Sequence, residues 1–220
     1  MDKAQHHKTA AKDRVSLKHK LGFGLGGANE CLLANSIGAM SSYVYNITLG
    51  VSPVLIGIAG AVPRLWEAIT DPAIGSMSDN YRSRFGRRKP FIAVGAILAD
   101  VIFAAIWFVP RGWSERAYFN YLLVGSILFF TAYALFNIPW NAMGYEMTPD
   151  YHERTKVMAY RSVFSALGGI GLPWLFALTK LSCFKDTLEG ARYVGVGTAI
   201  LMIILGLMPV LLGKENYSVQ

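Results

Sequence analysis

The sequence predicts an all-α integral membrane protein with six transmembrane helices. Three observations carry this prediction. Hydrophobic residues make up 53% of the 220 residues and charged residues only 16%, whereas soluble domains carry about 25% charge. The mean hydropathy is +0.36. The apolar residues are gathered into six stretches, each near the roughly 20 residues that a bilayer-spanning helix needs.

Short polar connections join these stretches, which cover residues 22–46, 52–78, 91–110, 117–144, 158–181 and 193–213. The third and the sixth are the cleanest apolar runs, and charges interrupt the second. No connection is long enough to form a soluble domain. We therefore expect a cytoplasmic N-terminal tail at 1–21, a six-helix transmembrane bundle at 22–213 and a cytoplasmic C-terminal tail at 214–220.

The Lys and Arg residues predict the orientation of the bundle. Fourteen of them lie in the two tails and in the second and fourth connections, and five lie on the other side. Since basic residues collect on the cytoplasmic side, both termini should be cytoplasmic, in the cell inner (plasma) membrane. The net charge of +7 then follows from cytoplasmic connections, and we expect no nucleic-acid partner. The first twenty residues lack an apolar core, which is typical of a tail and not of a signal peptide.

Histidine and cysteine placement argues against metal and covalent chemistry within the membrane. The two cysteines lie far apart, and all four histidines fall outside the apolar stretches. The sequence contains no Gly-x-Ser-x-Gly motif, the motif of one large class of serine hydrolases. We therefore expect a protein that is not an enzyme and that needs no cofactor.

The segment "RLWEAITDPAIG" places three charges within the second apolar stretch. Arg64, Glu67 and Asp71 are spaced three and four residues apart, so they share one face of a helix. A charge at the bilayer centre costs about 2.5–3.5 kcal/mol on insertion scales, so these groups should face the bundle interior or a water-filled cavity. A structural ion pair would use Arg64 and one carboxylate and leave the other free to bind a cation, either Na⁺ or H⁺.

Further polar residues are predicted at membrane depth in the other stretches. They are Asn29 and Glu30 in the first, Asp100 in the third, Asn137, Trp140 and Asn141 in the fourth, and Arg161 at the start of the fifth. Amides beside an aromatic ring suit a sugar, which presents both hydroxyl groups and an apolar face. The alternative for each Asn is hydrogen bonding between helices, and the alternative for Arg161 is a side chain that extends to the membrane interface. Asp100 either lines a pathway or pairs with a basic group. Pro139 should break the backbone hydrogen bonding of its helix.

The segment "DPAIGSMSDNYRSRFGRRKPFI" resembles the motif that follows the second helix of major facilitator superfamily transporters. The matching residues are Gly75, Asp79, Arg84, Gly86, Arg87 and Arg88. The resemblance implies an all-α fold in which this chain forms one six-helix half. It also implies a gating role, in which the basic cluster pairs with the carboxylate at the helix end or with helix ends of the other half. Such pairs hold the cytoplasmic side shut and break on opening.

Two other segments narrow the resemblance. "RLWEAITDP" and "NIPWNAMGYEMTPDYHERTKVMAYR" resemble glycoside–pentoside–hexuronide:cation symporters, the family of the melibiose/sodium symporter. The resemblance implies a cation site at Glu67 and Asp71. It also implies a substrate site, whose matching residues are Arg64, Arg161, Asn137 in place of a carboxylate, and either Asn29 or Glu30.

This resemblance predicts a secondary active transporter that couples a cation, Na⁺ or H⁺, to symport of a sugar or glycoside. The expected partners are that substrate, membrane lipids and a second six-helix half, because such transporters hold the substrate between two halves. The chain would supply the N-terminal half alone. The alternatives are a lysolipid:cation symporter of the same fold and a non-transporting truncated half.

Overall fold

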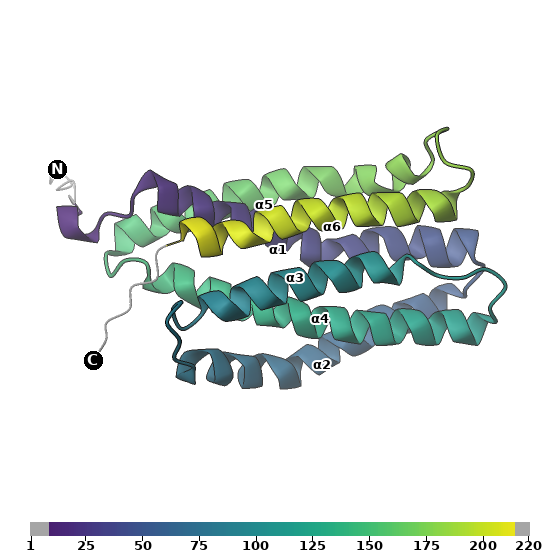
Figure 1. Cartoon of the computed structure of the whole chain (residues 1–220), viewed down its shortest axis with the longest axis horizontal. Helices are drawn as coiled ribbons and strands as arrows, with labels where there is room; N and C mark the ends of the chain where they lie inside the picture. The colour runs from purple at the N-terminus through teal and green to yellow at the C-terminus, as the bar shows by residue number, and fades with distance from the viewer. Residues whose placement is uncertain (1–8, 214–220) are drawn as a thin grey trace, which may run out of the picture.

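The computed structural model describes residues 9–213 and shows six long helices packed side by side (Figure 1). The described residues contain no β-strand. The helices are α1 (Leu17–Ser41), α2 (Pro53–Asn80), α3 (Lys89–Ile106), α4 (Glu115–Glu146), α5 (Tyr151–Thr179) and α6 (Thr187–Leu212). The all-α prediction is confirmed for this part of the chain. The tails 1–8 and 214–220 of the predicted organisation lie outside it.

Four helices, α3 to α6, are long and apolar enough to cross a membrane. The other two are as long but more polar. The first, α1, carries two lysines, several glycines and two asparagines, and α2 carries the Arg64, Glu67 and Asp71 stripe. Length and composition therefore support a multi-pass membrane protein.

The helices extend beyond the apolar stretches at several ends. The fifth begins at Tyr151, seven residues before the predicted span, and the sixth begins at Thr187. Each start is capped by an aspartate: Asp150 accepts a hydrogen bond from the backbone of Glu153, and Asp186 accepts two from the next turn. Hydropathy marks only the apolar part of a helix, whereas a capped polar turn extends it outside.

The first and fourth helices also differ from expectation. The first begins at Leu17, within the predicted tail, and continues after Ser41 into a π-helical segment, Ser42–Thr48. Pro139 lies buried inside α4, which continues from Glu115 to Glu146. Since proline has no backbone N–H, one backbone hydrogen bond is missing there, as predicted, but the helix does not end.

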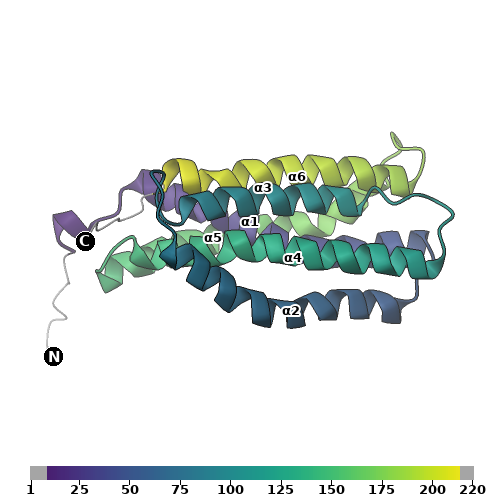
Figure 2. The same cartoon turned by 60° about the horizontal axis from the view of Figure 1, so that its bottom comes forward.

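The bundle core lies between α1, α3, α4 and α6. The first helix packs against α5 and α6, α3 packs against α4 and α6, and α2 packs mainly against α4. The largest fully buried side chains include Phe23, Phe103, Trp107, Phe136 and Trp140. Figure 2 shows α2 as a bent helix along one side of the bundle. The bend follows from Pro63 and Pro72 inside this helix.

Both described ends of the chain lie at the same end of the bundle (Figure 1). The start of α1 contacts the end of α6 directly, because Nδ1 of His19 lies 2.7 Å from the carbonyl oxygen of Leu212. The connections between α2 and α3 and between α4 and α5 are at this end too. The described basic residues of the first helix start and of these two connections are therefore gathered at one end of the molecule.

Candidate cation and substrate site

The charged stripe lies on the side of α2 that faces α1 and α4. Nη1 of Arg64 lies 3.1 Å from Oε2 of Glu67, one turn along the helix. Nη2 of Arg64 donates a second hydrogen bond to the carbonyl oxygen of Ala34 on α1, at 3.2 Å. Asp71 has one buried carboxylate oxygen with no hydrogen-bond partner among the described residues. The stripe thus holds one paired and one unpaired carboxylate.

Aromatic side chains of α4 form the wall opposite this stripe. The guanidinium of Arg64 lies over the ring of Phe130, 4.4 Å from its centroid. Tyr133 lies next to Phe130 on α4, with ring centroids 6.1 Å apart, and its hydroxyl lies 3.5 Å from Oε1 of Glu30. Glu30 therefore belongs to the same region as the α2 stripe, with Tyr133 between them.

A cavity of about 460 Å³ opens beside Arg64. Its walls come from α1, α2 and α4, and they include Asn35, Ser41, Ser126 and Phe130. The cavity is lined by both apolar and hydrogen-bonding groups next to the guanidinium of Arg64, which is the usual composition of a small-molecule site.

Four of the predicted substrate residues, Asn137, Trp140, Asn141 and Arg161, lie on α4 and α5. Arg161 lines a second open cavity, of about 580 Å³, together with Cys31, Ser162 and Ser165. Its guanidinium lies 4.9 Å from the ring centroid of Trp140, and Trp140 itself is fully buried. In this conformation the ring of Trp140 packs against the guanidinium of Arg161 and does not line the cavity.

The two asparagines of α4 bind each other. Nδ2 of Asn141 donates to Oδ1 of Asn137 at 2.7 Å and to its carbonyl oxygen at 3.0 Å. Both residues are half-buried. This pairing lies within one helix, so the alternative of hydrogen bonding between helices is not what the described contacts show.

The two neighbouring residues of α1 point in different directions. Asn29 is fully buried, and a Cβ atom at Gly206 of α6 would lie 2.6 Å from its Nδ2 atom. Glu30 is half-buried and faces Tyr133. Of these two residues, the structure places only Glu30 with the other candidate residues. Asp100 is also fully buried and has no hydrogen-bond partner among residues 9–213.

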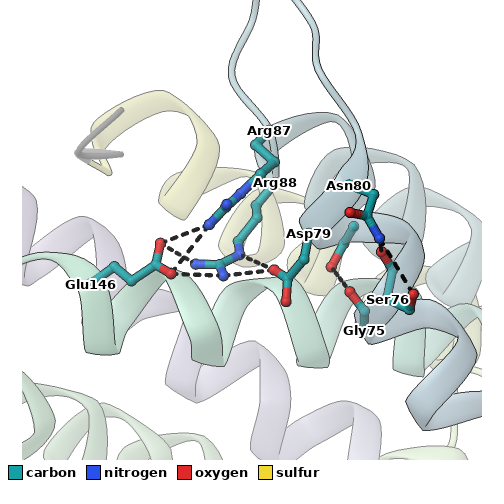
Figure 3. Close-up of polar contacts among 8 residues, drawn as sticks. Gly75, Ser76, Asp79, Asn80, Arg87, Arg88 and Glu146 are labelled. Carbon is teal, nitrogen blue, oxygen red and sulfur yellow. Dashed lines mark hydrogen bonds and ion pairs between the residues drawn. The ribbon is translucent and has the colours of Figure 1, made fainter. Parts of the chain in front are cut away.

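The predicted gating motif forms an ion-pair network at the basic end of the bundle (Figure 3). Nη2 of Arg88 donates to Oδ1 of Asp79 at 2.7 Å and to Oε1 of Glu146 at 2.9 Å. Nη2 of Arg87 lies 3.1 Å from Oε2 of Glu146. Burial alone would lower the pKa of Arg88, but the hydrogen bonds to both carboxylates outweigh it and raise that pKa. The network joins the ends of α2 and α4 through the α2–α3 connection.

The other motif residues are placed differently. Arg84 is exposed and lies over the ring of the adjacent Phe85, 4.8 Å from its centroid. Gly86 has a φ of +106°, a conformation that a residue with a side chain rarely adopts. Gly75 lies near α4, where an added Cβ would be 3.7 Å from Ile138. Gly86 thus permits the turn that brings the following arginines back to Asp79.

Sequence reasoning missed Glu146, Tyr133 and Phe130. Glu146 lies in the quoted segment "NIPWNAMGYEMTPD" at the end of a predicted helix, so an acidic helix end near a basic connection was a usable signal. Tyr133 and Phe130 gave no such signal, because aromatic residues are common throughout membrane helices. Among the described residues, no three His, Cys, Asp or Glu side chains lie close enough together to hold a metal ion.

Known proteins match most of this chain in sequence. A family model described as "MFS/sugar transport protein" matches residues 22–219. The putative glycoside/cation symporter YagG of Escherichia coli is 29% identical over 214 residues, which cover 94% of this chain and 45% of that protein. The uncharacterized symporter sll1374 of Synechocystis is 29% identical over 163 residues, 72% of this chain and 30% of that protein.

A lysophosphatidylcholine symporter is also similar to the chain. The sodium-dependent lysophosphatidylcholine symporter 1 of Mus musculus is 30% identical over 163 residues, 72% of this chain and 30% of that protein. The chain therefore spans less than half the length of each of these three curated relatives.

Proposed function

Because the chain belongs to the MFS/sugar transport protein family of the major facilitator superfamily, we propose that it is a six-helix half of a cation-coupled symporter for a sugar or glycoside. The relatives named as symporters support transport over catalysis. In this proposal all six helices cross the cell inner (plasma) membrane, α1 and α2 included. Their polar residues face a substrate cavity and not lipid.

The observation that carries the proposal is the arrangement of Arg64, Glu67 and Asp71. Glu67 has a counter-ion at 3.1 Å, and Asp71 has an unpartnered buried oxygen on the next turn. A cation bound between the two carboxylates would satisfy that oxygen. Since no third acidic, His or Cys ligand is near within the described residues, a bound Na⁺ would complete its shell with backbone carbonyls, water or substrate, whereas H⁺ needs no further ligand.

The substrate part of the proposal rests on Arg161, Glu30 and the pair Asn137 and Asn141. These groups offer charged and neutral hydrogen-bonding partners to hydroxyl groups, and Trp140 holds Arg161 in place. Arg64 lies between the cation carboxylates and the cavity of about 460 Å³. Cation binding would release Arg64 from Glu67 and so make its guanidinium available to the substrate, which couples the two ligands.

Orientation and gating follow from the basic end of the bundle. We assign this end to the cytoplasm, because the described Lys and Arg residues are concentrated there. The network of Asp79, Arg88 and Glu146 then lies at the cytoplasmic side, where it would hold α2 and α4 together in one access state. A second six-helix bundle, on the same or another polypeptide, would complete the cavity.

Lysolipid symport is the second candidate function. The similarity to sodium-dependent lysophosphatidylcholine symporters favours it. Large apolar side chains of α2 and α5 are also exposed, among them Leu65, Ile69, Ile170 and Trp174. An acyl chain would lie against such a surface, whereas a sugar would not need it. The same carboxylates would bind the cation in either case.

Uptake into membrane vesicles tests the proposal. Cells carrying the complete transporter, with this chain as its N-terminal half, supply vesicles for uptake of labelled glycosides and labelled lysophosphatidylcholine under an imposed Na⁺ or proton gradient. We expect uphill uptake of one substrate class, abolished by Glu67→Gln and by Asp71→Asn. Undiminished uphill uptake in both variants contradicts the cation site, and competition by lysolipids but not by sugars selects the second function.

A further inference from the structure

A second acidic residue lies deep in the bundle, apart from the α2 stripe. Asp100 occupies the middle of α3, which packs against α4 and α6. Its side chain is 0% exposed, and neither carboxylate oxygen has a hydrogen-bond partner among the described residues. The proposed symport mechanism gives this residue no role.

Two other polar side chains in the bundle core have the same property. Asn29 and Ser36 of α1 are both 0% exposed, and their side-chain polar atoms lack hydrogen-bond partners within residues 9–213. They are spaced seven residues apart and share one face of α1. At Gly206 of α6, an added Cβ would lie 2.6 Å from Nδ2 of Asn29 and 2.9 Å from Cβ of Ala96.

Ala96 connects this group to Asp100. The two residues are four apart on α3, so they lie on the same helix face, one turn from each other. Asn29, Ala96 and Gly206 therefore fix the place where α1, α3 and α6 meet, and Asp100 lies one turn further along α3. Three unpartnered polar side chains near one helix junction are unusual, because buried polar groups in proteins are nearly always hydrogen-bonded.

No opposite charge is available to Asp100 from the elements around it. The fourth helix carries no charged residue between Arg116 and Glu146, and α6 carries none after Arg192. Between Arg116 and Glu146, the titratable side chains of α4 are all tyrosines. On α1 the one charged side chain between Lys20 and Ser41 is Glu30, which faces Tyr133 and is itself acidic.

These surroundings decide which ligand Asp100 takes. A buried carboxylate without a counter-ion is strongly disfavoured in an apolar interior, so the group takes up a ligand that removes its charge. A metal cation needs several ligands, and in the described part of the chain Asp100 belongs to no group of three or more acidic, His or Cys side chains that could hold one. A proton needs one oxygen and no extra space.

We propose that Asp100 is a proton-binding site in the interior of the bundle, separate from the Glu67 and Asp71 carboxylates. The protonated acid is uncharged and so is compatible with this interior without a counter-ion. Asn29 and Ser36 of α1 are also buried and unpartnered among the described residues, and neither hydrogen-bonds to Asp100 in this conformation. Loss of this proton would place a bare charge between α3 and α6, so helix packing there depends on proton occupancy.

Infrared spectroscopy of the purified protein in lipid nanodiscs tests this site at neutral pH. The C=O stretch of a protonated carboxylic acid is separate from the bands of amides and carboxylates. We expect Asp100→Asn to remove an acid band, both in the wild-type chain and in a Glu67→Gln/Asp71→Asn background. The matched control Asp79→Asn, which changes an exposed aspartate, should leave that band in place.

An Asp100→Asn spectrum that keeps the full acid band and instead loses carboxylate intensity would overturn the proposal. A second measurement avoids the substitution at position 100 altogether. In Asp71→Asn protein labelled with ¹³C at the aspartate carboxyl, part of the acid band should shift to lower frequency. An unshifted band contradicts protonation of Asp100, and this result can be obtained even if the Asp100→Asn variant does not fold. Neither result depends on whether Glu67 and Asp71 bind the coupling cation.

Discussion

Nη1 of Arg64 lies 3.1 Å from Oε2 of Glu67 on the same face of α2. This ion pair divides the charged stripe into a compensated carboxylate and an uncompensated one, since an oxygen of Asp71 on the next turn has no hydrogen-bond partner among the described residues. Arg64 thus competes with any cation for the oxygens of Glu67. The pair is central to how the site would couple a cation to a substrate.

Removing Arg64 should therefore strengthen cation binding. The Arg64 side chain is 50% exposed, and exposed pairs contribute about 0–1 kcal/mol, so Arg64→Gln should tighten the cation dissociation constant by roughly twofold to fivefold. Isothermal titration calorimetry with Na⁺ measures this directly, and titration with acid measures the corresponding change for H⁺. Weaker cation binding in Arg64→Gln would mean that Arg64 positions the carboxylates and does not compete for them.

Arg88 should stabilise the basic end of the bundle far more than Arg84. Its side chain is 4% exposed and contacts two carboxylates that are about half exposed. We expect Arg88→Ala to lower the free energy of unfolding by about 1–3 kcal/mol, between the values for exposed and for fully buried ion pairs. Thermal unfolding in detergent measures this change in the free energy of unfolding. Arg84→Ala removes an exposed side chain and should change the free energy by about 0.5 kcal/mol or less.

Gly95 should resist even the smallest substitution. An added Cβ would overlap the backbone of Leu135 and Phe136 on α4, so α3 and α4 can pack closely only without a side chain here. We expect Gly95→Ala to cost about 1–3 kcal/mol of stability, the usual range for overpacking. In contrast, Gly171 on α5 has open space around it, and Gly171→Ala should be neutral or stabilising by up to about 1 kcal/mol. Equal effects at both positions would contradict the α3–α4 packing.

Glu153 should hold the N-terminal segment against α5. Its buried carboxylate accepts hydrogen bonds from Val15 N at 3.2 Å and Lys156 at 3.2 Å, and pairs with Lys20 at 2.5 Å. Glu153→Gln weakens these charge-assisted bonds, each of which contributes about 1.5–3 kcal/mol, so hydrogen exchange in residues 9–16 should accelerate by roughly tenfold or more. Glu189→Gln, at the other end of the bundle, is the control and should leave this segment unchanged.

The sequence predicted those features that depend on helix periodicity or on a short motif. The spacing of Arg64, Glu67 and Asp71 placed them on one face, and the structure confirms the Arg64–Glu67 pair. The motif around Arg88 left two partners open, Asp79 or helix ends of the other half, and the structure shows the pair with Asp79. Helix ends were less predictable, because the polar first turn of α5 is outside the apolar stretch and is held by the Asp150 cap.

Tertiary packing accounts for what the sequence could not provide. Asn29 and Glu30 are neighbours in the chain, and only packing against Gly206 decides that Asn29 is buried while Glu30 faces Tyr133. Trp140 was expected to contact substrate, but stacking with Phe23 and Phe136 places it in the core. Such choices depend on which helix lies alongside, and helix periodicity contains no information about that neighbour.

Cation binding at Glu67 and Asp71 is the claim on which the proposed function rests. Trp66 is adjacent to Glu67, and its indole donates to Thr131 on α4 at 3.0 Å, so its fluorescence should respond when the cation binds. We predict a saturable fluorescence change of the purified protein in nanodiscs on addition of Na⁺ or on acidification. It should be lost in Glu67→Gln/Asp71→Asn and kept in Asp13→Asn, which changes an aspartate outside both the site and the gating network. A wild-type response that persists in the double variant would contradict the account.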